Sequence, residues 1–209
     1  MSKKKSLKED MKKVGATRRE VVRVIKENAI DSETIKEYNL SSVGRVLLPK
    51  NLKRVEVLSL NKFYEGIGMS NINGGMEFYA NNLPQSPITI GEHGIIHITR
   101  FNELLSKNCC VFDNFIDYLS FLKMTSDLSA KEQSICDIII VGSVTNFSAV
   151  IKLSEKYKTV NCYFPFTVYG RVMFQTFKDK FGDKVSDSSK IFAGYKYLSE
   201  YVTENLGKV

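Results

Sequence analysis

The stretch Asp137-Ile138-Ile139-Ile140-Val141 decides the fold class of this 209-residue chain. A continuous run of branched apolar residues predicts a strand that is buried on both faces, as in a parallel sheet covered by helices. Strand and helix patterns alternate around it, with strands expected at 109–112, 159–164 and near 185, and helices at 114–124, 146–157, 169–181 and 195–206. This alternation predicts an α/β domain with right-handed crossovers, placed at residues 101–209.

A smaller β-rich (α+β) subdomain is expected at residues 31–100. Asp31 and Ser32 can cap a short helix that ends near residue 39. Residues 54–58 alternate apolar and polar side chains, and further strands are expected at 63–69, 76–79 and 94–99. The turn at 71–75 is rich in Asn and Gly, which tolerate positive φ.

The positive charge of the chain gathers at its N-terminus. The formal net charge is +7, and the first 26 residues hold ten bases and three acids, so 10 − 3 = +7 accounts for the whole excess. Thr17-Arg18-Arg19-Glu20 fits a capping box and predicts a basic amphipathic helix from residue 17 to about 28. Residues 1–30 are therefore predicted to form a basic arm with a short helix.

A basic arm of this kind indicates contact with nucleic acid, because phosphate binding is supplied mainly by Lys and Arg. A solubilising tail explains the same charge equally well. The arm residues predicted to bind nucleic acid are Lys3, Lys4, Lys5, Lys8, Lys12, Lys13, Arg18, Arg19 and Arg23.

Several classes of protein are excluded by composition. The chain lacks the roughly 20 consecutive apolar residues of a membrane helix and the apolar core of a secretory signal, so we expect a cytoplasmic protein without a membrane partner. Its four cysteines include no C-x-x-C pair. His93 and His97 flank a strand-like run, which places them about 13 Å apart. No metal site is therefore expected.

Three stretches of the chain are similar to one known family. They are residues 64–77 with 86–89, residues 111–122, and residues 163–201, which include Gly170-Arg171. In this order and spacing they resemble the Toprim-containing, primase-like proteins carried by mobile elements of Bacteroides-type bacteria. The resemblance implies a Toprim-like Rossmannoid parallel sheet flanked by helices, preceded by the β-rich region and the basic helical arm. It also implies a role in DNA replication or mobilisation.

The family's catalytic residues are only partly present. The resemblance implies a Glu after the first strand, which serves as acid or base, and an Asp-x-Asp after the third, which holds Mg²⁺. Asp113 stands at the Glu position, and Pro165 and Thr167 replace both aspartates. We therefore predict a degenerate active site without catalysis and without a cofactor. The alternative is a primase- or nuclease-type enzyme with Mg²⁺ in a rearranged site around Asp113, helped by Asp117.

The surviving residues have simpler explanations that stay open. Asp113 can be a helix N-cap before Asn114. Arg171 can contact phosphate or pair with a carboxylate. The aromatic side chains near the end of the third strand can stack on bases or fill the volume of the lost metal site. These aromatic residues are Tyr163, Phe164, Phe166 and Tyr169.

Three functions remain. The favoured one is a non-catalytic nucleic-acid-binding accessory, with DNA as the preferred partner and replication or mobilisation proteins as further partners. The second is the metal-dependent enzyme. The third is a protein-interaction scaffold that binds no nucleic acid at physiological salt.

Overall fold

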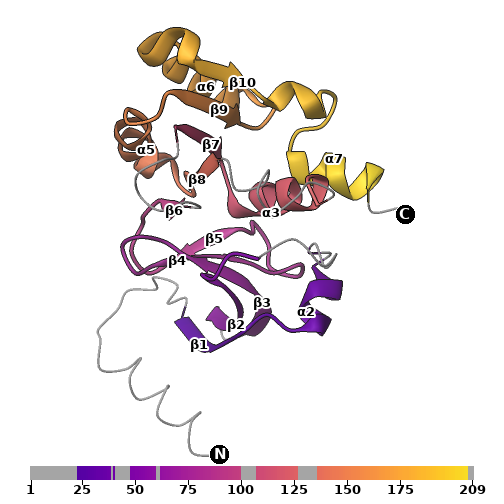
Figure 1. The fold of residues 1–209 in the computed structure, drawn as a ribbon. Helices are drawn as coiled ribbons and strands as arrows, with labels where there is room; N and C mark the ends of the chain where they lie inside the picture. Colours follow the sequence, from indigo (N-terminus) through magenta and orange to yellow (C-terminus); the bar gives the residue numbers. More distant parts are fainter. Residues whose placement is uncertain are drawn as a thin grey trace, which may run out of the picture.

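The computed structural model describes residues 23–38, 40, 48–59, 62–99, 107–126 and 136–206. Within these ranges the chain forms two five-stranded sheets (Figure 1). The first has the strand order β1-β2-β3-β4-β5 and the second the order β10-β9-β7-β8-β6. The sheets follow one another along the chain, and helices cover the second one.

The first sheet is antiparallel throughout. Its strands are β1 (Arg23–Asn28), β2 (Leu52–Ser59), β3 (Lys62–Ser70), β4 (Met76–Tyr79) and β5 (Ile88–Ile90). Helix α2 (Ser32–Glu37) lies between β1 and β2, and Asp31 caps it by accepting a hydrogen bond from the Thr34 N–H at 2.8 Å. The expected helix cap at Asp31 and the β-rich character of this region are confirmed.

The helix expected from residue 17 to about 28 is wrong where the structure describes it. Residues 23–28 form strand β1, which pairs with β2 and carries an irregularity between Val24 and Lys26. Ile25 is 42% exposed, so the helical spacing of Val24 and Ile25 does not define a buried face. Pairing with a long neighbouring strand overrides the local helical pattern. Residues 17–22 of the expected helix lie outside the described ranges.

The second sheet holds the α/β half of the chain. Its strands are β6 (Ile96–Ile98), β7 (Asn108–Phe112), β8 (Cys136–Ile140), β9 (Thr159–Tyr163) and β10 (Val185–Asp187). All neighbours are parallel except β6, which runs antiparallel to β8. The helices are α3 (Phe115–Met124), α5 (Phe147–Ser154), α6 (Val168–Phe181) and α7 (Leu198–Asn205), with short 3₁₀ turns η1 (Val144–Asn146), η2 (Gly182–Lys184) and η3 (Ser189–Phe192).

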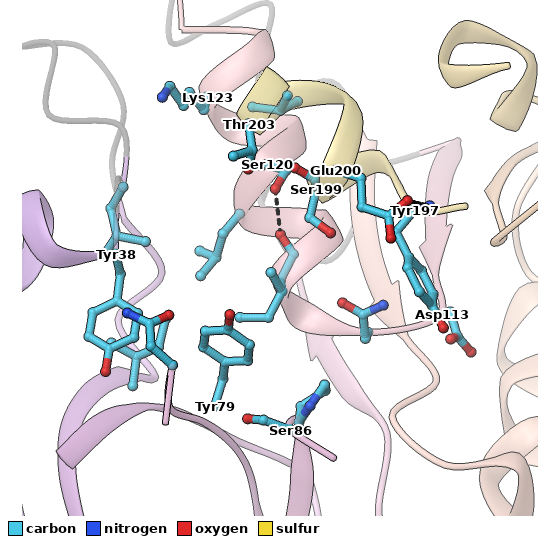
Figure 2. A pocket seen from close by; sticks show the side chains of 18 of the residues that line it. Tyr38, Tyr79, Ser86, Asp113, Ser120, Lys123, Tyr197, Ser199, Glu200 and Thr203 are labelled. Carbon is cyan, nitrogen blue, oxygen red and sulfur yellow. Dashed lines mark hydrogen bonds between the residues drawn. The ribbon is translucent and has the colours of Figure 1, made fainter. Parts of the chain in front are cut away.

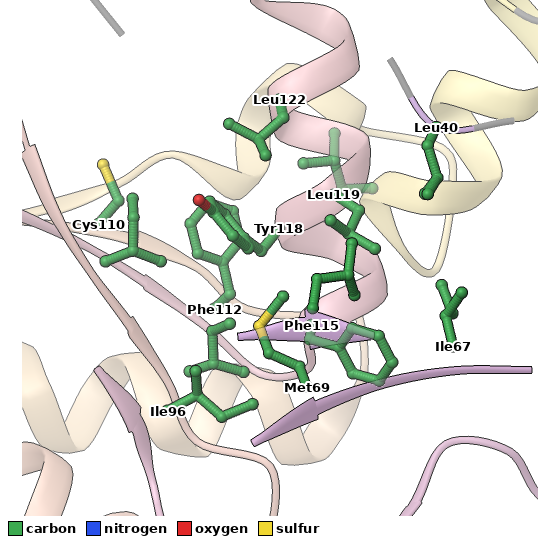
Figure 3. Close-up of a cluster of buried hydrophobic side chains, with 14 of the residues drawn as sticks. Leu40, Ile67, Met69, Ile96, Cys110, Phe112, Phe115, Tyr118, Leu119 and Leu122 are labelled. Atoms are coloured by element: carbon green, nitrogen blue, oxygen red, sulfur yellow. The ribbon is translucent and has the colours of Figure 1, made fainter. Parts of the chain in front are cut away.

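Two apolar clusters cover the faces of the second sheet. One contains side chains of α5 and α6 and of the strands β7, β8, β9 and β10, and its members Phe177 and Val160 are fully buried. The other packs α3 and α7 on the opposite face and extends to Ile67 and Met69 of β3 (Figure 3). Because this cluster takes side chains from both sheets, the β-rich region and the α/β region share one core.

The predicted α/β fold is confirmed: a β-rich antiparallel sheet precedes a mostly parallel sheet flanked by helices. Every strand and helix expected between residues 109 and 206 is present, within a few residues of its expected bounds. The expected boundary near residue 100 falls in a segment outside the described ranges and stays a prediction, while β6 before it already belongs to the second sheet. No helix among the described residues is long and apolar enough to span a membrane.

Candidate functional site

Asp113 lies where open α/β sheets place their sites, directly after the carboxyl end of the central strand β7. Its backbone carbonyl accepts a hydrogen bond from the Gly142 N–H at 2.8 Å, which ties the ends of β7 and β8 together. The expected capping role belongs to the next residue. Asn114 is the N-cap of α3, and its side chain accepts from the Asp117 N–H at 2.9 Å. Capping therefore does not explain the Asp113 side chain.

Burial dominates the electrostatics of this edge. Burial raises the pKa of Asp113 to about 6, and the neighbouring charges of Asp117 and Glu77 contribute to that rise. Asp117 is fully buried, and burial raises its pKa to about 6 even though hydrogen bonds to its carboxylate act in the opposite direction. Its carboxylate accepts from the Ser199 N–H at 2.9 Å and from the Asn114 amide at 3.2 Å. Asp117 therefore joins α3 to α7.

Glu77 on β4 is a third carboxylate near this edge, and its role was not apparent from the sequence. It is 2% exposed and accepts a hydrogen bond from the Thr89 hydroxyl at 2.8 Å. Burial raises its pKa. Its carboxylate approaches Gly142 so closely that a Cβ on that glycine would stand 2.9 Å from Oε1. The sequence signal was a lone acid in the short apolar strand Met76–Tyr79.

The residues after β9 serve packing and capping. Pro165 is buried, and the Thr167 hydroxyl caps α6 by accepting from the Gly170 N–H at 3.0 Å. The Phe166 ring packs on Phe192 with centroids 5.7 Å apart. The Phe164 ring, 2% exposed, lies 5.6 Å from that of Phe177. For these two aromatic residues the packing interpretation is confirmed.

The remaining two aromatic residues of this group differ from each other. Tyr163 stacks on Phe112, with ring centroids 4.7 Å apart and an interplanar angle of 12°. Tyr169 is 39% exposed on the first turn of α6. Burial raises the pKa of its hydroxyl to about 12, and the nearby Asp113 charge contributes. Tyr169 is thus the aromatic side chain of this group that solvent, or a ligand, can reach.

A Mg²⁺ site of the Toprim kind does not fit these residues. Neither Pro165 nor the capping Thr167 offers a carboxylate, and the oxygens of Asp117 are already engaged by α7 and Asn114. Across the described ranges, no three His, Cys, Asp or Glu side chains are grouped so that they can hold a metal ion. The histidines also have other surroundings: His97 Nε2 lies 3.0 Å from the Tyr157 hydroxyl, and His93 is exposed.

Cationic side chains lie beside this edge. Arg171 is exposed, and its guanidinium carbon lies 6.0 Å from the centroid of the Phe166 ring. In the part of the chain that the structure describes, no carboxylate forms an ion pair with Arg171. The Lys196 carbonyl accepts from the Phe166 N–H at 2.8 Å, so Lys196 lies next to the same residue. Of the predicted arm residues, Arg23 begins β1 and the others, Lys3 to Arg19, lie outside the described ranges.

Asp113 also borders a pocket of about 750 Å³ between the two sheets (Figure 2). Its walls come from α2, β3, β4, α3 and α7, so both regions of the chain build it. The pocket collects residues that are far apart in the sequence, and the sequence alone did not predict it.

Comparison with known proteins identifies no family for this chain. No family model matches the chain, and none of the curated proteins matches it. Among solved structures, the chain is similar to the primase fragment of the bacteriophage T7 primase-helicase protein. The identity is 13%, the TM-score is 0.49, and the match covers 87% of this chain and 71% of that chain.

A second similar structure is the complex of the bacteriophage T7 lagging-strand DNA polymerase with primase domains of two gp4 subunits, bound to an RNA/DNA hybrid and dTTP. Here the identity is 12% and the TM-score is 0.43, and the match covers 82% of each chain.

Replacing Asp113 with asparagine is expected to stabilise the fold at neutral pH. The pKa of about 6 in the folded protein lies above the ordinary value of 3.8, so folding favours the protonated carboxyl. The free-energy cost of burying the ionised Asp113 carboxylate is fully present above pH 6, and it disappears as the pH falls towards 4. We expect Asp113→Asn to raise the free energy of unfolding by about 2 kcal/mol at pH 7.5 and by almost nothing near pH 4.

Urea denaturation at the two pH values measures this difference. Asp183→Asn is the matched control, because the Asp183 side chain is exposed on η2. An Asp113→Asn effect that is the same at both pH values would show that charge burial is not its cause.

Proposed function

We propose that this chain is a non-catalytic Toprim-like protein that binds nucleic acid, DNA in preference to RNA, as an accessory in replication or mobilisation of a mobile element. The absence of catalysis is inferred from Pro165 and Thr167, which stand where the resemblance implies two aspartates. Pro165 is buried, and Thr167 is the N-cap of α6. A carboxylate pair at these positions would be needed for Mg²⁺, which prefers oxygen ligands of this kind. Of the three positions at which the resemblance implies an acid, Asp113 alone carries one.

Two features support binding to nucleic acid. The basic N-terminal residues supply the whole net charge of the chain, and such charge binds phosphates through counterion release. Arg171, without a carboxylate partner among the described residues, and the half-exposed Tyr169 follow β9 on the first turn of α6. An arginine and an accessible aromatic ring are the groups with which proteins hold single strands.

The metal-dependent enzyme remains the second candidate, supported by the gathering of Asp113, Glu77 and Asp117 near one edge. One or two carboxylates can hold Mg²⁺ when substrate phosphates complete its coordination. An interaction scaffold is the third, supported by the exposed apolar side chains of Val144, Val168 and Val172 near the carboxyl edge. No cofactor is proposed for the favoured function.

Fluorescence anisotropy with labelled single- and double-stranded DNA and RNA, over a salt series, tests the proposal. We expect the full chain to bind, and a variant with Lys3, Lys4, Lys5 and Lys8 changed to Gln to bind more weakly. Its slope of log K against log salt should fall by up to about 3, since each phosphate contact contributes roughly 0.7–0.9. Lys180→Gln is the matched control, because Lys180 pairs with Glu155 at 2.6 Å.

The outcomes separate the three candidates. Absence of binding near physiological salt would overturn the proposal in favour of the scaffold. Primer synthesis or strand cleavage that requires Mg²⁺ and disappears in Asp113→Asn would establish the enzyme. Unchanged binding by the four-lysine variant would show that these lysines do not contact the nucleic acid. Arg171→Gln would then be the next variant to measure.

A further inference from the structure

The pocket between the sheets has the size of a small-molecule site. Its volume of about 750 Å³ falls within the range of pockets that enclose such ligands. Figure 2 shows Tyr38 and Tyr79 on one wall and Tyr197 with Asp113 across the opening. Its walls come from β3 and β4 of the first sheet, from helices α2, α3 and α7, and from the residues that follow β7 and β8, so both regions of the chain hold the cavity.

The charge of the lining is strongly negative. Four carboxylates border the pocket, from Glu37 on α2, Asp113 after β7, and Glu200 and Glu204 at α7, against a single cation, Lys123. This leaves a formal charge of −4 + 1 = −3 when all are ionised. A ligand that carries phosphate would be repelled, so the pocket is unsuited to the nucleic-acid backbone.

Two of these carboxylates are uncompensated within the described part of the chain. Glu200 accepts hydrogen bonds from the backbone N–H groups of Lys196 and Tyr197, at 2.9 and 3.3 Å. Asp113 and Glu204 have no such donor and no ion-pair partner among the described residues. Asp113 is also largely buried, and a buried carboxylate without a partner costs free energy that a bound cation would recover.

The rest of the lining suits the body of an organic cation. The Tyr38 and Tyr79 rings meet edge to face, with centroids 6.1 Å apart, and the Tyr38 hydroxyl is fixed by donating to the Glu65 carbonyl at 3.1 Å. Tyrosine faces attract ammonium and guanidinium groups. Ile116 of α3 and Pro87, both partly exposed, add apolar surface on which a carbon chain can pack.

We propose that this pocket binds a small organic cation, an alkyl ammonium or guanidinium on an aliphatic stem. The carboxylates that border the pocket, Asp113 and Glu204 among them, attract its charge, and the tyrosines with the apolar side chains contact its stem. The inference is independent of nucleic-acid binding, since it uses a different surface and a ligand of opposite charge.

Isothermal titration calorimetry of the full chain with the diamine cadaverine tests the proposal. The uncharged diol of the same chain length is the ligand control, at physiological ionic strength. We expect saturable single-site binding of the diamine and none of the diol. Glu204→Gln and Asp113→Asn should each weaken the diamine about five- to tenfold, because each removes one charge close to the cation.

Glu155→Gln is the matched protein control, since Glu155 pairs with Lys180 away from the pocket and should leave the affinity unchanged. Glu204 is exposed, so its variant keeps the fold, and thermal unfolding of each variant verifies this. Equal binding of the diol would overturn the proposal, and so would diamine binding that falls as much in Glu155→Gln as in Glu204→Gln. Neither result bears on the anisotropy measurements with nucleic acid.

Discussion

Replacement of Gly170 by alanine is expected to lower the free energy of unfolding by about 3 kcal/mol or more. A Cβ at this position would stand 2.0 Å from the Pro165 carbonyl oxygen. That oxygen belongs to the backbone of a buried residue and cannot rotate away as a side-chain tip can. The first turn of α6 cannot shift freely either, because the Gly170 N–H is bonded to the Thr167 hydroxyl at 3.0 Å.

Urea denaturation monitored by circular dichroism measures the loss, with Gly182→Ala as the matched control. Gly182 ends α6 with φ at +59°, and no atom lies within 4 Å of the position that a Cβ would take there. With φ at +59° and ψ at −131°, its substitution therefore costs backbone strain alone, about 1–3 kcal/mol. If both variants lose the same free energy, the close approach to Pro165 is not what requires glycine at position 170.

The need for glycine at position 170 has a structural cause. Gly170-Arg171 is the part of this segment that matches the primase-like Toprim proteins that the sequence resembles, whereas Pro165 and Thr167 do not match them. The structure supplies a packing reason for the glycine, since the helix begins directly against the Pro165 carbonyl. The presence of Gly170 therefore carries no information about phosphate binding. Arg171 is exposed, and its guanidinium carbon lies 6.0 Å from the centroid of the Phe166 ring.

The α/β half was predictable because its signals are local and strong. The run Ile138-Ile139-Ile140 is fully buried in β8, as a strand covered on both faces must be. The turns, caps and amphipathic helices that follow repeat at the spacing of β-α units, so topology rules leave few arrangements. Pro165 and Thr167 stand directly in the sequence at the two positions where the resemblance implies aspartates.

What the sequence could not provide is long-range pairing. Strand β1 has a helical apolar pattern, and only its partner β2, far along the chain, makes it a strand. Glu77 gives a comparable case, because its proximity to Asp113 depends on how the first sheet meets the second. The pocket combines α2 with α7 for the same reason. Local patterns contain no information about such contacts.

Phe112→Ala is expected to be the other severely destabilising substitution, at about 3–5 kcal/mol. Phe112 ends the central strand β7 and is 0% exposed. Its ring stacks on Tyr163 at 4.7 Å and lies 5.4 Å from Phe121 and 5.7 Å from Tyr118 of α3. Three aromatic neighbours surround the cavity that alanine would leave, and neighbours held by a strand and a helix cannot collapse into it.

Phe63→Ala is the matched control, because Phe63 is 52% exposed on β3 and should cost less than about 1 kcal/mol. Urea titration of both variants and of Phe112→Leu measures the series, and the leucine variant should fall between the other two. A Phe112→Ala loss as small as that of Phe63→Ala would contradict the packing of α3 on β7.

Because Asp113 follows Phe112 directly, Phe112→Leu should also weaken cadaverine binding if the rigid end of β7 holds the carboxylate in the pocket. Unchanged affinity in a folded Phe112→Leu protein would show that α3 positions Asp113 without help from this ring.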